Sequence, residues 1–286
     1  MAQPATLTFT KMHGLGNDFV VVNCLSNTLP EERLPEWSTR LNDRRFGIGG
    51  DGLILILPSR SADFRMRMFN PDGTEAEMCG NGIRCFARWV HDAGLTNGRQ
   101  VTVETAAGVK QLRLHVRDGG FVSVRVDMGE PVLKPALIPV RADGDGPVVA
   151  QSINVDGKKL EITAVSMGNP HAVLFVPDVS AAPVSRLGPL IENHRLFPSR
   201  TNVQFVQVTG RQEIKVRTWE RGAGETLACG TGACAAVVAC VLNRLTARHV
   251  TVHLPGGDLS VEWLGDNRVV MTGPAVVVFH GEVTLV

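Results

Sequence analysis

The chain contains one pattern twice, 150 residues apart (229 − 79), and this duplication constrains the fold more than any other feature. RMFNPDGTEAEMCGNG, residues 67–82, aligns with RTWERGAGETLACGTG, residues 217–232. The alignment places Cys79 over Cys229 and superimposes the glycines that follow them. A single match of this kind could arise by chance, so other landmarks decide whether the two halves are related.

Three further landmarks match at nearly the same spacing and in the same order. They are VTVETAAG (101–108) with VTVHLPGG (250–257), Gly16-Asn17 with Gly168-Asn169, and Asp51 with Asn202. A near-constant spacing over several landmarks is typical of an internal duplication. The sequence therefore predicts two similar domains.

The division between the domains is predicted from composition and from the last apolar stretch. Residues 128–152 are rich in proline and glycine, which indicates an irregular crossover. The final stretch, AVVVFHGEVTLV (275–286), has no counterpart in the second half, and we expect it to return to the first domain. The prediction is an N-terminal domain of residues 1–127 plus 275–286 and a C-terminal domain of residues 128–274.

Alternating patterns predict many strands and few helices. The predicted strands are 18–23, 53–57, 64–69, 110–116, 121–128, 172–176, 203–208, 214–219, 250–254 and 259–263. The predicted helices are 31–44, 80–93, 183–194 and 230–245. Helix 230–245 is apolar nearly all round, so it should be buried. We predict an α+β fold of two pseudo-symmetric domains, each a curved, mostly antiparallel or mixed sheet wrapped around a central apolar helix.

Composition and charge exclude several classes of partner. The 286 residues are 44% hydrophobic and 20% charged, which is enough apolar material for a packed core. The net charge is +1 without a block of like charge, so neither nucleic acid nor an anionic membrane is expected as a partner. The first residues lack the apolar core of an export signal, and the longest apolar run, Ala233–Leu242, is too short to cross a membrane. We expect a cytoplasmic protein.

Six cysteines are present, and a reducing compartment makes a disulfide framework unexpected. The chain has neither a C-x-x-C motif nor a His-rich cluster, so no metal site is predicted. Four cysteines are interpreted as small buried apolar residues: Cys24, Cys85, Cys234 and Cys240. Cys79 and Cys229 differ from these because each begins a Cys-Gly-x-Gly motif at the start of a predicted helix.

A cysteine at a helix start is chemically activated. The first backbone N–H groups of a helix have no partner within it, and the macrodipole adds partial positive charge there. Both effects favour thiolate over thiol. The glycines allow a ligand to approach the backbone, whose N–H groups can hold a carboxylate. Each motif thus predicts one reactive sulfur beside one anion site.

Two equivalent thiols favour proton exchange at a stereocentre. One group removes a proton from one face of a carbon and the other returns a proton to the opposite face. Aligned N–H donors in a dry site can stabilise the charge that develops, and no sequence feature marks a Schiff-base lysine for pyridoxal phosphate. The doubled motif therefore fits an amino-acid racemase or epimerase that uses no cofactor.

Other functions stay open on the residues alone. A hydrolase with a single cysteine nucleophile is one alternative, and structural glycine turns or a binding module without chemistry are others. One dispensable motif cysteine would favour the nucleophile, whereas two indispensable cysteines would favour the racemase.

Four longer motifs closely resemble the diaminopimelate epimerase family. They are KMHGLGNDFVVVN (11–23), FNPDGTEAEMCGNGIRCFARWV (69–90), SMGNPHAV (166–173) and ERGAGETLACGTGACAA (220–236). The resemblance runs from about Leu7 to the C-terminus. It implies an isomerase that interconverts LL- and meso-2,6-diaminoheptanedioate in lysine and peptidoglycan-precursor biosynthesis. It also implies a cleft between the domains as active site, no cofactor and a homodimer. Proline racemase and hydroxyproline epimerase share Cys-Gly-x-Gly elements, so a racemase of that type is the alternative.

The resemblance implies a role for each matching residue. Cys79 and Cys229 become the paired acid and base, and His171 and Glu220 become the groups that tune their pKa values. The expected substrate-binding residues are Asn17, Asn70, Gly80, Asn81, Asn169, Asn202, Glu220, Arg221, Gly230 and Thr231. Arg221 suits a carboxylate, and Glu220 suits an ammonium group.

The chain departs from the family pattern at two positions. Some relatives carry glutamine where this chain has Gly52, so one substrate-side amide is absent or replaced. Some relatives carry serine where this chain has Thr231, and either hydroxyl can serve.

Overall fold

The computed structural model describes residues 5–27, 29–96, 98–142 and 144–285. The chain divides into two compact units. Unit 1 comprises Met1–Val126 and Gly273–Val286, and unit 2 comprises Asp127–Thr272.

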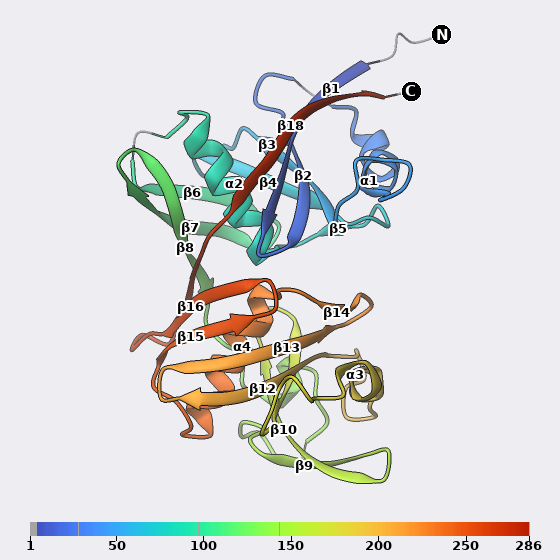
Figure 1. Cartoon of the computed structure of the whole chain (residues 1–286), viewed down its shortest axis with the longest axis vertical. Helices are drawn as coiled ribbons and strands as arrows, with labels where there is room; N and C mark the ends of the chain where they lie inside the picture. The colour runs from blue at the N-terminus through green and yellow to red at the C-terminus, as the bar shows by residue number, and fades with distance from the viewer. Residues whose placement is uncertain (1–4, 28, 97, 143, 286) are drawn as a thin grey trace. The chain divides into compact units, whose positions relative to one another are not determined.

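Unit 1 is dominated by strands, with one long helix and two short ones (Figure 1). Its elements in chain order are β1 (Ala5–Gly14), β2 (Asn17–Asn23), η1 (Glu31–Arg33), α1 (Leu34–Asn42), β3 (Gly52–Leu57), β4 (Phe64–Phe69), β5 (Glu75–Ala76), α2 (Gly80–Asp92), β6 (Gln100–Thr105), β7 (Gly108–Arg117), β8 (Gly120–Gly129) and β18 (Val276–Leu285).

Unit 2 repeats this arrangement. Its elements are η2 (Pro135–Leu137), β9 (Gln151–Val155), β10 (Lys158–Ser166), β11 (Pro170–Phe175), α3 (Val184–Glu192), β12 (Asn202–Gly210), β13 (Glu213–Glu220), β14 (Gly224–Thr226), α4 (Gly230–Leu242), β15 (His249–Leu254), β16 (Gly257–Trp263) and β17 (Val269–Gly273). β8 begins in unit 1 and ends in unit 2, whereas β17 begins in unit 2 and ends in unit 1.

The two units share one order of strand pairing. In unit 1, β1 and β2 pair antiparallel, β2 and β3 parallel, β3 and β4 antiparallel, and β4 and β6 parallel. In unit 2, β10 and β11 pair antiparallel, β11 and β12 parallel, β12 and β13 antiparallel, and β13 and β15 parallel. A matching sequence of mixed pairings confirms the predicted α+β, pseudo-symmetric fold class.

The last strand returns to the first unit. β18 pairs antiparallel with β1 from Ala5 opposite Leu285 to His13 opposite Val276, with one register shift after Lys11. Figure 1 shows the dark red β18 alongside the blue β1. This pairing gives β1 neighbours on both sides, because β2 pairs with its other edge.

Both faces of the central strands are covered, which explains why β3 reads as an unbroken apolar run, GLILIL. In unit 1, Val20, Leu53 and Phe69 pack with α1 residues such as Trp37 in one core cluster. The alternate residues of these strands, including Ile54, are equally buried and point to the other face, where α2 contacts β2, β3 and β4.

Unit 2 has the same two-sided packing. Val203 and Phe205 of β12 belong to a core cluster that includes Leu187 and Ile191 of α3. The central helix α4 packs against β10–β13, β15 and β16, and every residue from Gly232 to Cys240 is buried. The predicted burial of the apolar helix is therefore confirmed. Among the described residues, no helix has the length and apolar character that a membrane crossing requires.

Candidate active site

Both motif cysteines cap a central helix in the same way. Cys79 precedes α2 with φ −133° and ψ 116°, and Cys229 precedes α4 with φ −125° and ψ 110°. The sulfur of each accepts the backbone N–H three residues on, Gly82 or Gly232, over 3.4 Å. An N–H donor and the positive end of the helix dipole both stabilise a negative sulfur. Each unit therefore contains one thiol in a setting that favours thiolate.

The predicted site residues of unit 1 are Asn17, Asn70, Cys79, Gly80 and Asn81. The amide oxygen of Asn17 accepts a hydrogen bond from Asn81 Nδ2 over 3.0 Å and lies 4.0 Å from Cys79 Sγ. Three of the predicted residues thus meet around one amide oxygen. Gly80 is the first buried residue of α2 and continues from the capping sulfur.

Asp51 holds the other end of the Asn17 amide. Asn17 Nδ2 donates to Asp51 Oδ2 over 2.6 Å, and the backbone N–H of Asp18 donates to the same oxygen over 3.0 Å. Arg44 binds Asp51 Oδ1 over 2.7 Å from the opposite side. The sequence marked Asp51 only as a landmark of the duplication, and nothing in its motif indicated this contact.

Asp18 belongs to the same charged cluster. Arg44 donates to its carboxylate over 2.6 Å, and Lys11 approaches it to 2.5 Å. Burial alone would raise the pKa of Asp18, but the hydrogen bonds from Arg44 and Lys11 lower that pKa to about 2. The Asp18 carboxyl therefore stays ionised at neutral pH, and Arg44 links it to Asp51.

Asn70 lies in a turn that binds its own side chain. Its Nδ2 donates to Thr74 Oγ1 over 2.9 Å, and its backbone N–H donates to the carbonyl of Thr74 over 2.8 Å. Ser38 donates its hydroxyl to the Asn70 carbonyl over 2.8 Å. Asn70 is thus held by the turn, apart from the hydrogen bonds that join Asn17, Cys79 and Asn81.

In unit 2, hydrogen bonds link several of the predicted site residues. The predicted residues of this unit are Asn169, His171, Asn202, Glu220, Arg221, Cys229, Gly230 and Thr231. His171 Nε2 lies 2.9 Å from Asn169 Oδ1. Asn202 donates its amide to the Pro170 carbonyl over 2.9 Å and accepts the backbone N–H of Arg221 over 2.9 Å.

Glu220 and Thr231 are two further predicted residues of unit 2. Thr226 donates its hydroxyl to Glu220 Oε1 over 2.6 Å, which orients that carboxylate. Thr231 Oγ1 lies 3.6 Å from Cys229 Sγ. Gly230 is the buried first residue of α4, directly after the capping sulfur.

His171 is fully buried, and this controls its charge. Burial and, to a smaller extent, the charge of Arg221 lower the pKa of His171, and the amide of Gln204 raises it; the net result is a pKa of about 3. The ring is therefore neutral at neutral pH. With Nε2 donating to Asn169, Nδ1 carries the lone pair. A neutral ring can affect Cys229 through its dipole but not through a positive charge.

Glu192 of α3 supports the end of β13 and the turn that follows it, where Glu220 and Arg221 lie. Its nearly buried carboxylate accepts Trp219 Nε1 over 2.7 Å and the backbone N–H of Gly222 over 3.2 Å. Arg200 binds the same carboxylate over 3.1 Å. The helical pattern at 183–194 predicted the element but not this role.

Strand register corrects one match in the duplication. Asn202 lies opposite His171 in the parallel pair of β11 and β12, and Gly52 lies opposite Phe19 in the parallel pair of β2 and β3. Asn202 therefore corresponds to Gly52 and not to Asp51. A Cβ atom at Gly52 would lie 2.7 Å from Met68 Cε, so the Met68 side chain fills the space that a side chain at position 52 would enter.

The remaining cysteines are buried, as the sequence predicted. Burial raises the pKa of Cys24 to about 11 and the pKa values of Cys85 and Cys240 to about 12. These three groups stay thiols at neutral pH. Within the described ranges, no group of three or more His, Cys, Asp or Glu side chains is arranged to hold a metal ion.

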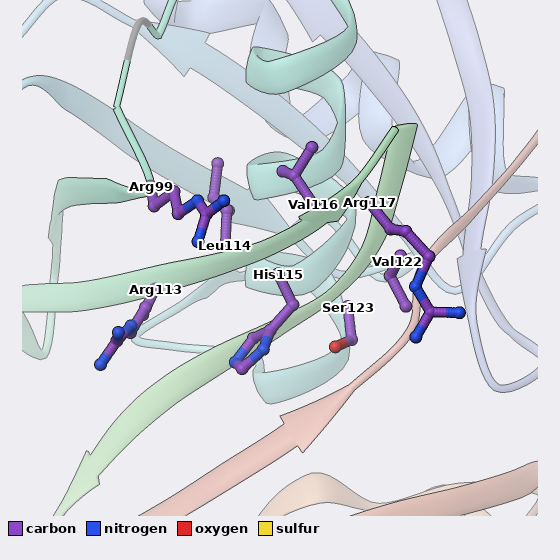
Figure 2. A pocket seen from close by; sticks show the side chains of 8 residues that line it. All are labelled: Arg99, Arg113, Leu114, His115, Val116, Arg117, Val122 and Ser123. Atoms are coloured by element: carbon purple, nitrogen blue, oxygen red, sulfur yellow. The ribbon is translucent and has the colours of Figure 1, made fainter. Parts of the chain in front are cut away.

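A basic hollow of about 280 Å³ lies on β7 and β8 of unit 1 (Figure 2). Its lining consists of Arg99, Arg113, Leu114, His115, Val116, Arg117, Val122 and Ser123. None of the predicted site residues belongs to it.

The fold is shared with several solved structures. The structure resembles a phenazine biosynthesis protein of the PhzF family from Bacillus anthracis with a TM-score of 0.71 at 18% identity, covering 98% of this chain and 100% of that one. It resembles a hydroxyproline epimerase from Agrobacterium vitis with a TM-score of 0.69 at 16% identity, covering 100% and 94%. At such low identity these similarities show the two-lobed epimerase fold alone.

Sequence comparison identifies the family among proteins that share this fold. The model of the diaminopimelate epimerase family matches residues 9–134 and 163–278. The diaminopimelate epimerase of Acetivibrio thermocellus is 56% identical over 280 residues, covering 98% of this chain and 99% of the relative. That of Moorella thermoacetica is 57% identical over 278 residues, covering 97% and 99%. The chain belongs to the diaminopimelate epimerase family.

Proposed function

We propose that the protein interconverts LL- and meso-2,6-diaminoheptanedioate by proton exchange between two cysteines, in lysine and peptidoglycan-precursor biosynthesis. The observation that carries the mechanism is the identical capping geometry of Cys79 and Cys229 at topologically equivalent helix starts. Each unit acts as one domain of the enzyme and contributes one sulfur.

The reaction consists of two proton transfers. The thiolate of one cysteine takes the α-proton and becomes a thiol, and the electron pair of the broken C–H bond spreads into the adjacent carboxylate. The thiol of the other cysteine then gives its proton to the opposite face of the carbon and becomes a thiolate. The enzyme ends with the protonation states of its sulfurs exchanged, and the reverse reaction restores them.

Backbone donors stabilise the intermediate in this proposal. The N–H groups that begin α2 and α4, at Gly80, Asn81, Gly230 and Thr231, are directed along the helix axis toward the capping end. An enediolate-like carboxylate carries more charge than the ground-state carboxylate, so fixed donors stabilise the transition state more than the substrate. This is the contribution that an added electron sink would otherwise make.

The remaining predicted residues hold the substrate. Arg221 presents a guanidinium group that suits the distal carboxylate, and Glu220 presents a carboxylate that suits an ammonium group. Hydrogen bonds hold the side-chain amides of Asn17, Asn169 and Asn202 in fixed orientations. The amide of Asn70 is held by Thr74 in the turn that contains both residues. Together these groups distinguish a substrate that carries two amino-acid centres from one that carries only one.

The test is epimerisation of LL-diaminoheptanedioate in deuterium oxide without added cofactor, with proline as the rival substrate. The expected result is one deuterium at the inverted α-carbon of the first compound and none in proline. Exchange into proline alone would indicate a proline-type racemase. Absence of exchange with both, with activity restored by pyridoxal phosphate, would contradict the proposal.

The proposal includes a homodimer, supported by an exposed apolar surface on β18. Val276, Val278 and Phe279 are 40%, 54% and 46% exposed. A neighbouring groove of about 840 Å³ is lined in part by Phe9 and Trp89. A second copy of this surface would cover these side chains. Light scattering of the wild-type protein should report twice the mass of one chain. Val278→Lys should lower the measured mass toward that of one chain. A wild-type monomer at micromolar concentration would contradict the dimer.

We also propose that the protein is cytoplasmic. All six cysteines are thiols and not disulfides, as is usual for proteins of a reducing compartment. Fractionation of the host cell with an antibody against the chain tests this placement, and recovery outside the cytoplasmic fraction would contradict it.

A further inference from the structure

The two capped helices begin over chemically different surfaces. We call the three residues of unit 2 that lie beneath the start of α4, His171, Gln204 and Thr218, the polar floor. They come from adjacent strands: β11, β12 and β13 respectively. Their neighbours in sequence, such as Val203 and Phe205, pack with α3 on the opposite face of the sheet. Alternation therefore directs the polar floor toward α4.

Unit 1 has an apolar surface at the corresponding positions. Phe19 corresponds to His171, because each begins the parallel pairing of its unit, opposite Gly52 or Asn202. Ile54 pairs with Met68 as Gln204 pairs with Thr218. The corresponding residues are Phe19, Ile54 and Met68. The duplication thus preserved the backbone and the cysteine but changed the chemistry beneath the sulfur.

In each unit, a side chain of these strands approaches the glycine that lies three residues after the motif cysteine. A Cβ atom at Gly82 would lie 3.0 Å from Ile54 Cδ1. A Cβ atom at Gly232 would lie 2.8 Å from Gln204 Nε2 and 3.1 Å from Cys229 Sγ. The amide of Gln204 and the sulfur of Cys229 therefore border the same small space beside Gly232. Gln204 also acts on the ring of His171, so its amide is close both to that ring and to the space beside the sulfur.

The polar floor has unused hydrogen-bonding capacity in a buried place. His171 and Gln204 have no exposed surface, and Thr218 is 1% exposed. His171 Nδ1, both polar atoms of the Gln204 amide and Thr218 Oγ1 make no well-formed hydrogen bond within the described chain. Buried polar groups are normally satisfied, and leaving them unsatisfied costs stability. The apolar floor of unit 1 shows that the fold does not require polar residues there.

We propose that Gln204 and Thr218 are positioning residues whose buried dipoles stabilise the thiolate of Cys229, so that the two sulfurs hold a proton with different affinity. An N–H donor beside a sulfur favours its charged form. The apolar side chains beneath Cys79 offer no such donor, and the Asn17 amide oxygen that faces Cys79 favours its protonated form. This inference rests on the proposed function, because it concerns the same two sulfurs.

The elements that meet at the start of α4 carry several other ionisable groups. The sheet face that carries the polar floor contributes His171 and Glu220, and Arg221 follows on the next loop. Helix α4 contributes only its own cysteines, Cys234 and Cys240. His171 is neutral at neutral pH, so the polar floor acts through dipoles and not through a net charge.

The test measures thiolate absorbance against pH in the substrate-free protein. Cys79→Ser leaves Cys229 as the only motif cysteine. In that background Gln204→Met keeps the side-chain length but removes the amide, and the titration midpoint should rise by at least about one pH unit. Thr218→Val should shift it in the same direction by less. The matched control is Gln207→Met on the same strand, whose side chain lies on the opposite face and accepts the Val179 N–H; its midpoint should not move.

Two further measurements separate function from structure. With both cysteines present, Gln204→Met should move the acid limb of the kcat/KM profile to higher pH. Its thermal midpoint should equal or exceed that of the parent, because an unsatisfied buried amide has been removed. Midpoints of the Gln204→Met and Gln207→Met proteins that agree within error would overturn the proposal. The titration uses no substrate, so it decides the inference even if the wild-type protein failed to epimerise diaminoheptanedioate.

Discussion

Asn17 donates its amide N–H to Asp51 over 2.6 Å, and this hydrogen bond turns the amide oxygen of Asn17 toward Asn81 and Cys79. An amide can rotate by half a turn and exchange its oxygen and nitrogen. The carboxylate prevents that rotation, because it only accepts hydrogen bonds. Asp51 is itself bound by Arg44.

Asp51→Ala should therefore lower kcat/KM by about 10- to 100-fold, since a small displacement of a group near the reacting atoms has an effect of this size. Asp51→Asn keeps one oxygen for Asn17 and should retain more activity than Asp51→Ala. Steady-state kinetics in both directions make the comparison.

The control for this prediction is Asp63→Ala. Asp63 is another carboxylate of unit 1 and accepts two hydrogen bonds from Thr102, but it does not contact Asn17. Its kcat/KM should stay near the wild-type value. Equal activity of Asp51→Ala and Asp63→Ala would show that Asn17 needs no such support.

Glu192 stabilises unit 2 by satisfying three donors at once. Removing its carboxylate leaves Trp219 Nε1 and the Gly222 N–H without their acceptor, and leaves Arg200 without its partner. Glu192→Ala should reduce the free energy of unfolding by about 2–4 kcal/mol. Denaturant titration at pH 7 measures the change.

Glu161→Ala provides the comparison, because Glu161 is exposed on β10 of the same unit. It should change the free energy of unfolding by less than about 0.5 kcal/mol. If both glutamates gave similarly small changes, the buried network around Glu192 would not contribute as described.

His171 makes the fold sensitive to acid. Its folded pKa, about 3, lies below the ordinary value of 6.5, so between these values the unfolded chain binds a proton that the folded chain does not. Stability is therefore lost as the pH falls from 6.5 toward 3. From pH 7 to pH 5 this group alone should lower the free energy of unfolding by about 2 kcal/mol.

His171→Phe removes this contribution and copies the residue that occupies the corresponding position, Phe19. The loss of stability between pH 7 and pH 5 should be smaller in the variant by about the same 2 kcal/mol. Denaturant titrations of both proteins at the two pH values give the result. A parallel loss in both would mean that His171 is protonated in the folded protein.

Much of the fold follows from local patterns in the sequence. The predicted helices 80–93 and 230–245 correspond to α2 and α4, because their apolar content and glycine starts are strong signals. The strand β1 was absent from the predicted strands, although it lies between two neighbours in the sheet. Its pattern, ATLTFTKMHG, mixes polar and apolar residues, and only the pairing with β18 shows why it is a strand.

The candidate site was only partly readable from the sequence. Cys79 and Cys229 stand out because two identical helix starts are rare, and the structure places them in matching caps. Asp51, Gln204 and Glu192 carry no motif. Their importance depends on which strands and loops lie beside them, and this is set by pairing between distant segments. Local patterns do not contain that information.

The central claim is that both cysteines act on one carbon, and deuterium exchange by single-cysteine variants tests it most directly. Wild-type protein, Cys79→Ala and Cys229→Ala would each be incubated with LL-diaminoheptanedioate in deuterium oxide, and formation of the deuterated meso product followed by mass and chirality. Loss of the group that accepts or donates the proton should slow epimerisation at least about 100-fold in each variant. Epimerisation at a near-wild-type rate in either variant would contradict the two-cysteine account.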